Sequence, residues 1–176
     1  YAGEEYWDRD GRWIGNVLSS YGILYNKDAI QRLGISPAPQ AWRDLTNPKL
    51  LGEVALCDPT KSGSIAKAFE NLIQQQMQLS LHRLKEADGG VMTKEIEDRA
   101  VRDGWDEGMR ILRLIGANAR YFTDSSQKPP IDVSQGNSAA GICIDFYGRY
   151  QAEAVKRRDD SGRLVYVTPR GGTVSS

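Results

Sequence analysis

Histidine is nearly absent from this sequence, with one in 176 residues. That residue, His82, lies in a predicted helix, where we expect a surface or boundary position. A catalytic triad would instead need an oriented base beside a nucleophile. The Gly-x-Ser-x-Gly, His-Glu-x-x-His and Cys-x-x-Cys patterns are also missing. These absences count against an enzyme, and we expect neither catalytic residues nor a cofactor.

Cysteine is scarce as well. Cys57 and Cys143 are too few and too far apart for a disulfide scaffold or a zinc site. Each lies inside an apolar, strand-like run of residues. We therefore expect two buried free thiols that pack as small hydrophobic side chains.

The chain has no excess of charge and no long apolar run. Lysine plus arginine number 23, as do aspartate plus glutamate. We therefore expect no nucleic-acid partner, and any site for a charged ligand must be local. No apolar run approaches the roughly 20 residues that span a bilayer. The sequence starts without an initiator methionine or a signal-peptide pattern, so both ends look cut and export cannot be read from them.

What is present has ordinary globular composition, and residues 1–176 fit one domain. Extended structure is expected over 12–26, 53–57, 119–122, 140–144 and 164–167. Helices are expected over 27–33, from just after Ser64 to Gly89, over 94–115 and over 146–157, with short turns near 42–45 and 132–135. Helices that alternate with short apolar strands predict an α/β fold. Its sheet should be mostly parallel, with helices on both faces.

Three finer expectations concern helix faces and ends. Helical spacing predicts that the first long helix buries Ile65, Phe69, Leu72, Ile73, Met77 and Leu84. The same reasoning predicts that the second buries Val101, Trp105, Met109, Leu112 and Ile115, and stops at Gly116. Pro129 and Pro130 predict a loop between the neighbouring strand and the short turn that follows.

The segment from Asp58 to Ser64 joins a strand to the start of a long helix. Gly63 lets the backbone approach a ligand, Ser62 and Ser64 offer hydroxyls, and the first helical amides have no internal acceptor. With the helix dipole these features predict an anion-binding corner. The alternative is simple N-capping by Ser62 or Ser64. The segment, which includes Thr60, lacks the Gly-x-x-x-x-Gly-Lys-Ser/Thr order of a triphosphate loop.

A second corner, Asp145-Phe146-Tyr147, also follows a predicted strand. Ligands of open α/β sheets bind beyond the carboxyl ends of strands, so we expect the two corners to lie close together. The alternative is that Asp145 only caps its helix and Tyr147 only packs on it.

Several segments follow one another in an order typical of one family. They are Trp13-Ile14-Gly15, Tyr21-Gly22-Ile23-Leu24-Tyr25-Asn26-Lys27, Trp42-Arg43-Asp44-Leu45, Pro48-Lys49-Leu50, Gly52-Glu53-Val54-Ala55-Leu56, Asp58-Pro59-Thr60-Lys61-Ser62-Gly63-Ser64, Gly141-Ile142-Cys143-Ile144-Asp145-Phe146-Tyr147 and Thr168-Pro169-Arg170-Gly171-Gly172-Thr173. Across nearly the whole chain the sequence resembles type II periplasmic binding proteins. The group it resembles most is the ferric-iron-type family of ABC transporter solute-binding proteins.

The resemblance implies that two α/β lobes close on a ligand and that this chain is the second lobe. It implies hinge crossings over 12–26 and 163–176, with Ser19 and Ser20 facing the cleft and Arg170 near the boundary between lobes. It further implies a small-molecule or ion solute, an ABC permease as partner, a periplasmic or extracellular location at the membrane, and a monomer. The expected ligand-binding residues are Ser19, Ser20, Thr60, Ser62, Gly63, Ser64, Asp145, Tyr147 and Arg170.

One departure bears on the ligand. Iron-binding members carry adjacent tyrosines where this chain has Phe146-Tyr147, so one oxygen donor that ferric iron would prefer is missing. Similar proteins also bind phosphorylated or sulfonated solutes, which suit the corner at Ser62–Ser64. We expect an anionic solute or ferric iron, and leave any metal site open.

Two other classes of function remain compatible with the residues. A phosphate- or nucleotide-handling α/β enzyme would use the same corner and show saturable turnover. An effector-binding domain of a transcription regulator would follow a helix-turn-helix segment in its parent gene, whereas a signal peptide there would exclude it.

Overall fold

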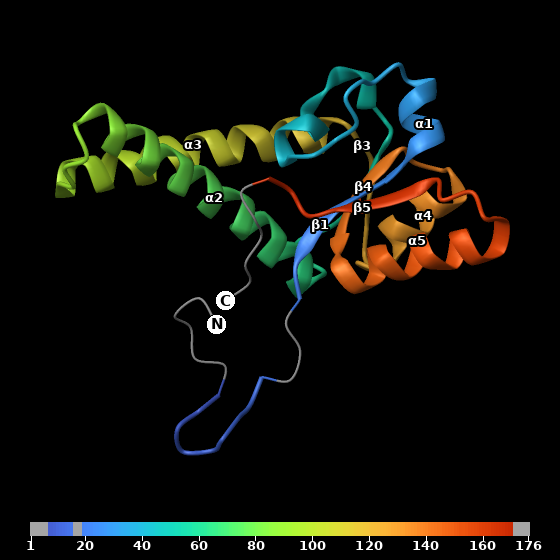
Figure 1. The fold of residues 1–176 in the computed structure, drawn as a ribbon, viewed down its shortest axis with the longest axis horizontal. Helices are drawn as coiled ribbons and strands as arrows, with labels where there is room; N and C mark the ends of the chain where they lie inside the picture. The colour runs from blue at the N-terminus through green and yellow to red at the C-terminus, as the bar shows by residue number, and fades with distance from the viewer. Residues whose placement is uncertain (1–6, 16–18, 171–176) are drawn as a thin grey trace.

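A computed structural model describes residues 7–15 and 19–170 (Figure 1). The elements, in chain order, are β1 (Tyr21–Asn26), α1 (Lys27–Arg32), η1 (Trp42–Thr46), η2 (Pro48–Leu50), β2 (Val54–Cys57), α2 (Gly63–Ala87), α3 (Lys94–Ala117), β3 (Ala119–Thr123), α4 (Lys128–Gln135), β4 (Ala140–Ile144), α5 (Asp145–Asp159) and β5 (Leu164–Val167). Within these ranges no helix combines the length and the apolar character that a bilayer crossing needs.

The sheet of the described residues has five strands in the order β3-β2-β4-β1-β5. β2 pairs in parallel with β3 and β4, whereas β1 pairs antiparallel with β4 and β5. All strands except β1 therefore point the same way. The predicted α/β fold with a mostly parallel sheet is confirmed, with β1 as an antiparallel insertion.

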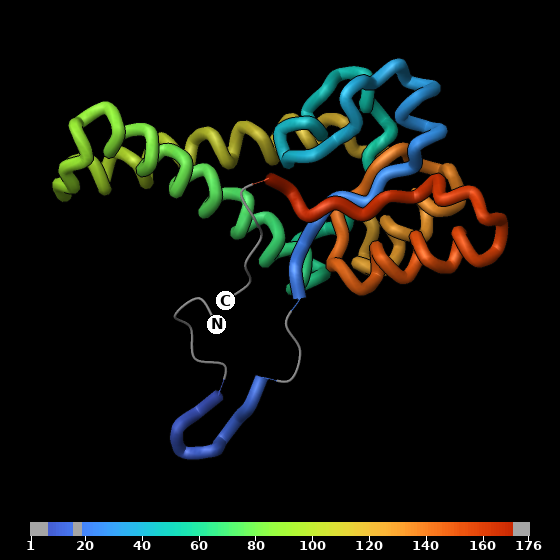
Figure 2. The backbone as a smooth tube through the Cα atoms, in the orientation of Figure 1, coloured from blue at the N-terminus to red at the C-terminus, as the bar shows by residue number. Residues whose placement is uncertain are grey.

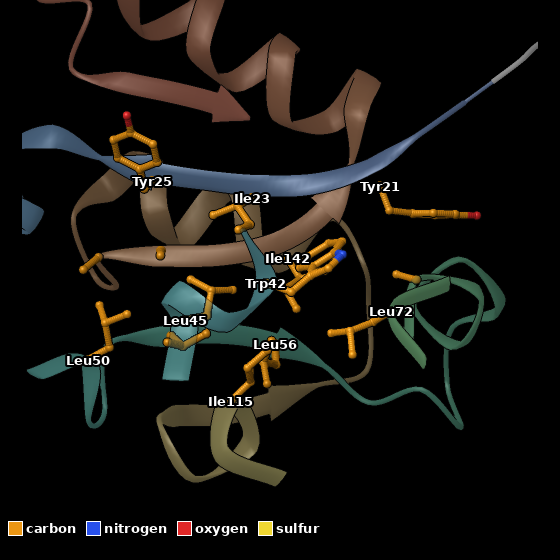
Figure 3. Close-up of a cluster of buried hydrophobic side chains, with 14 of the residues drawn as sticks. Tyr21, Ile23, Tyr25, Trp42, Leu45, Leu50, Leu56, Leu72, Ile115 and Ile142 are labelled. Atoms are coloured by element: carbon orange, nitrogen blue, oxygen red, sulfur yellow. The ribbon is translucent and has the colours of Figure 1, made fainter. Parts of the chain in front are cut away.

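Helices cover both faces of this sheet. The larger core joins side chains of β1, β2 and β4 to η1, α2 and α3 (Figure 3). The opposite face packs on α4 and α5 through Val133 and Val155. Buried strands such as β4 are apolar at every position because both of their faces meet helices.

The structure corrects two expectations about element boundaries. Pro129 and Pro130 do not lie in a loop, because they occupy the first turn of α4, where a missing N–H breaks no helical hydrogen bond. Of the described residues in the segment 12–26, which was predicted to be extended, Tyr21–Asn26 form a strand. An isolated bridge joins Trp7 to Ile14, and residues 16–18 lie outside the described ranges.

The predicted buried face of α3 is right only at its end, where Ile115 is buried and Leu112 packs on the larger core. Val101 and Trp105 are 48 % and 51 % exposed, whereas Gly104 and Gly108 are buried. A Cβ on Gly104 would lie 2.3 Å from Met77 Cα, so α2 and α3 are in backbone contact there. The small residues form the packed face because they let the two helices approach. Gly116 does not stop α3, which continues to Ala117.

Together α2 and α3 form a two-helix arm that projects beyond the sheet (Figures 1 and 2). Gly89 and Gly90, both with positive φ, lie in the turn between the helices, as the sequence predicts. Near the sheet the arm buries Ile65 and Leu72 of α2 and Ile115 of α3 in the larger core. The start of α2 is thereby fixed against the end of β2.

Candidate functional site

The connections that follow the neighbouring strands β2 and β4 leave the sheet on opposite faces. The connection that leaves β2 continues into α2 on one face, whereas β4 continues into α5 on the other. The two strands pair only at Val54 with Ala140 and at Ala55 with Gly141. Their ladder thus ends before their carboxyl ends. In open α/β sheets this position is where ligands bind.

We call the side of the sheet where β2, β3, β4 and β5 end the carboxyl edge. β1 begins there, because Tyr21 lies opposite Ile144. The N–H of Asp145 donates to the carbonyl of Ser20 at 2.8 Å. The N–H of Asp58 donates to the carbonyl of Thr123 at 2.8 Å. The structure therefore brings Ser19–Ser20, Asp58–Ser64 and Asp145–Tyr147 to one edge.

The first corner is the start of α2. The side chain of Ser62, the N-cap residue, makes no capping hydrogen bond, and its Oγ lies 3.1 Å from Ser64 Oγ. Among the described residues, the N–H groups of Gly63 and Ser64 have no acceptor. No acidic side chain occupies the first turn, and no atom lies within 4 Å of a Cβ placed on Gly63. Open amides and a positive helix end together can bind an anion.

Thr60 and Asp58 are engaged with each other beside this corner. The Thr60 N–H and hydroxyl donate to Asp58 Oδ1 at 2.8 and 2.7 Å. Chiefly through the hydroxyl hydrogen bond, Thr60 lowers the pKa of Asp58. The Asp58 carboxylate is thus held within its own loop, and Thr60 serves as its partner.

Cys57 forms the floor of the corner and is fully buried, as is Cys143 in β4. Burial raises the pKa of both thiols, and hydrogen bonds with Thr123 and Ser62 partly offset this at Cys57. The prediction of buried free thiols is confirmed.

Because both thiols are buried, we expect them to react slowly in the folded chain. We expect the native chain to resist a colorimetric disulfide reagent and to release two thiols after unfolding, because reactivity requires an exposed thiolate. Rapid reaction of the folded chain would show that the floor of the corner opens to solvent.

The second corner is the start of α5. Asp145 Oδ1 accepts the N–H of Phe146 at 2.8 Å, so this carboxylate interacts with its own helix. The Tyr147 hydroxyl accepts a hydrogen bond from Gln127 Nε2 at 2.9 Å. The Phe146 and Tyr147 rings pack edge to face, with centroids 4.4 Å apart. Tyr147 is half-buried and Phe146 is 48 % exposed.

Gln127 belongs to a third loop at this edge, which the sequence did not single out. A hollow of about 470 Å³ lies beside it, lined by Phe122, Thr123, Asp124, Ser125, Gln127, Lys128 and Ile131. Lys128 is ion-paired with the buried Asp132, so its charge is already balanced. The sequence shows that this loop follows a strand, β3. Its place at the carboxyl edge could not be predicted without knowing that β3 pairs in parallel with β2.

Arg170 lies apart from the two corners. Its N–H donates to the Gln40 carbonyl and its carbonyl accepts from Gln75 Nε2, both at 2.9 Å. Gln75 follows Ser64 by 11 residues, which is about 16 Å along a helix. The Arg170 backbone therefore lies beside the middle of α2.

A larger hollow of about 700 Å³ lies on the arm. Four arginines and three acidic residues line it, with Gln76, Leu79 and Ser80; the charged residues are Arg43, Arg83, Arg110, Arg113, Asp103, Asp106 and Glu107. Glu107 binds both Arg43 and Arg110, and mainly the hydrogen bond from Arg110 lowers its pKa. Because Glu107 already pairs with Arg43 and Arg110, and because the hollow lies away from the carboxyl edge, we favour the corners as the solute site. In the described part of the chain, no group of three or more His, Cys, Asp or Glu could hold a metal ion.

Comparison with known proteins places this geometry in context. The family described as bacterial extracellular solute-binding protein matches residues 1–176. An uncharacterized protein of Haemophilus influenzae is 32 % identical over 164 residues, which are 93 % of this chain and 38 % of that protein.

Two solved structures share the fold. The periplasmic binding protein AfuA of Actinobacillus pleuropneumoniae, solved with exogenous fructose-6-phosphate bound, is 24 % identical with a TM-score of 0.57 over 93 % of this chain and 42 % of that one. The apo ferric ion-binding protein A of Pasteurella haemolytica is 16 % identical with a TM-score of 0.60, over 96 % and 44 %. The chain thus spans 38 to 44 % of the length of these three proteins.

Proposed function

The chain belongs to the bacterial extracellular solute-binding protein family, and from this premise we propose that it binds a small anionic solute for an ABC-type importer. Its fold is one lobe of a type II periplasmic binding protein. The family consists of binding proteins rather than enzymes. The proposed site is the carboxyl edge between the starts of α2 and α5.

The open start of α2 carries this proposal. Gly63 and Ser64 present N–H groups without an acceptor among the described residues, and the first turn holds no carboxylate. An anion that accepts these hydrogen bonds would also meet the positive end of a helix of 25 residues. The AfuA structure holds a phosphorylated sugar, which supports a solute of this chemical class.

We also propose that this chain is the second of two lobes, as the family resemblance implies. Residues 12–26 and 163–176 would cross to the other lobe, with Ser19 and Ser20 on the cleft side. In support, β1 begins and β5 ends at the carboxyl edge, since Ile23 pairs with Val167. Arg170, held beside Gln75, would lie at the boundary between lobes. The permease would be the membrane partner, and the protein would work in the periplasm or outside the cell.

The solute class can be tested by calorimetric titration of this chain. We expect inorganic phosphate and fructose 6-phosphate to compete for one site, and fructose alone to give no heat of binding. Equal affinity for fructose and its phosphate would contradict an anion site. Conversion of the phosphate ester during the titration would instead favour the phosphate-handling enzyme.

Ferric iron is the second candidate solute, because Tyr147 places a phenol at the carboxyl edge. The neighbouring position carries Phe146, which offers no oxygen donor. We expect the chain to show no visible phenolate-to-iron charge-transfer band after ferric loading. Appearance of the band, and its loss in Tyr147→Phe, would establish iron as the solute.

A further inference from the structure

The arm exposes an apolar strip along the outer side of α3. The strip consists of Val101, Trp105 and Met109, which are 48 %, 51 % and 37 % exposed. Their spacing of four residues places them on one side of the helix. The packed side, at Gly104 and Gly108, faces α2. A hollow of about 280 Å³ lies on the strip, beside Trp105.

A strip of this kind marks a contact surface. Large exposed apolar patches with polar rims are typical of interaction sites, and tryptophan is enriched among the residues that dominate binding. The arm projects beyond the sheet (Figure 2), so another protein can reach α3 without displacing the core. The question is which surface complements this strip.

The charged residues beside the strip make it complementary to itself. They are Asp98, Arg102, Asp106 and Arg113, all exposed. When two α3 helices pack antiparallel about Trp105, a residue before Trp105 lies opposite a residue equally far after it. Val101 then lies opposite Met109, Asp98 lies opposite Leu112 and one residue from Arg113, and Arg102 lies opposite Gly108, two residues or about 3 Å along the axis from Asp106 of the other copy.

These four charges are available for such pairing. In the described ranges, none of them makes an ion pair within the chain. Their neighbours along α3 do: Asp103 binds Arg99, and Glu107 binds Arg43 and Arg110. Charge complementarity around an apolar centre thus distinguishes the outer side of α3.

We propose that the α3 strip binds a second copy of this chain, forming a twofold dimer centred on Trp105. The family resemblance implies a monomer; the strip indicates instead that the arm is a self-association surface. The dimer is independent of solute binding, because the strip lies away from the carboxyl edge.

The first test is sedimentation equilibrium of the chain over a range of concentrations. We expect a monomer–dimer equilibrium that Trp105→Ala weakens by about thirtyfold or more, as for a buried interface anchor. Leu51→Ala is the matched control, because Leu51 is 71 % exposed at the end of η2, outside the arm. A monomer at every concentration, or a dimer that Trp105→Ala leaves intact, would overturn the proposal.

The second test uses reversed charges. Asp98 and Arg113 are 15 residues apart, about 22 Å along one helix, so they cannot pair within the chain. Asp98→Arg and Arg113→Asp should each weaken the dimer, since like charges then face each other, and the double variant should restore it. Failure of the double variant to recover would exclude the antiparallel arrangement.

Discussion

Replacing Gly104 with alanine is expected to lower the free energy of unfolding by about 3 kcal/mol, the upper end of the cost of overpacking. The added Cβ would lie 2.3 Å from Met77 Cα and 2.5 Å from Met77 N. Both are backbone atoms, so no side chain can rotate away. The two helices must separate, and contacts along the arm weaken together.

Gly116→Ala is the matched control on the same helix. Its Cβ would lie 3.7 Å from Phe122 Cζ, an ordinary contact. Alanine at a helical glycine should then raise stability by about 0.5–1 kcal/mol. Urea unfolding of both variants measures the two effects. Equal effects would show that close packing at Gly104 is not what holds the arm.

Replacing Ser64 with aspartate is expected to weaken inorganic phosphate binding about a hundredfold, or about 2.7 kcal/mol at 1.4 kcal/mol per factor of ten. A carboxylate in the first turn of α2 would compete for the open amides and repel the anion. It would also favour the helix, because acidic side chains stabilise a helix start. Lost binding would therefore not reflect lost folding.

Thr93→Asp is the corresponding control at the other long helix. Thr93 caps α3, and its Oγ1 accepts the N–H of Ile96 at 3.3 Å. Aspartate caps equally well, and this position lies at the far end of the arm. Calorimetry should give wild-type phosphate affinity for Thr93→Asp. If Ser64→Asp also binds phosphate normally, the anion does not sit at the start of α2.

Some elements could be predicted from the sequence because turn residues mark where they begin and end. β4 and β5 have the predicted limits, since each is an apolar run between turn residues. α4 was missed because a proline pair usually ends regular structure, and only the neighbouring chain shows that the pair begins a helix. The reversed direction of β1 depends on its pairing with β4 and β5, which no local pattern records.

The packed face of α3 illustrates a different difficulty. Apolar periodicity selected Val101, Trp105, Met109, Leu112 and Ile115, of which the last two pack on the core and the first three are exposed. The structure buries Gly104 and Gly108 because a helix neighbour can approach closest where side chains are smallest. The error is informative, because it leaves the apolar strip exposed for a partner.

The sequence could predict those parts of the candidate site in which residues suited to binding an anion lie between the end of a strand and the start of a helix. Ser62, Gly63 and Ser64 follow a strand and begin a helix, so their placement at the carboxyl edge could be predicted before their neighbours were known. Gln127 could not, because its contact with Tyr147 joins a loop to the first turn of α5, 20 residues away in the sequence. Whether these residues bind a solute stays a prediction.

The most direct test of the central claim is an amide NMR titration of this chain with inorganic phosphate. The account predicts saturable shifts of the Gly63 and Ser64 N–H signals, which wild-type protein shows and Ser64→Asp loses. One lobe supplies one wall of the proposed cleft, so we expect weak binding, and fast exchange in NMR still reports a millimolar affinity. Shifts confined to the arginine-lined hollow around Arg43 and Arg113, with Gly63 and Ser64 unchanged, would contradict it.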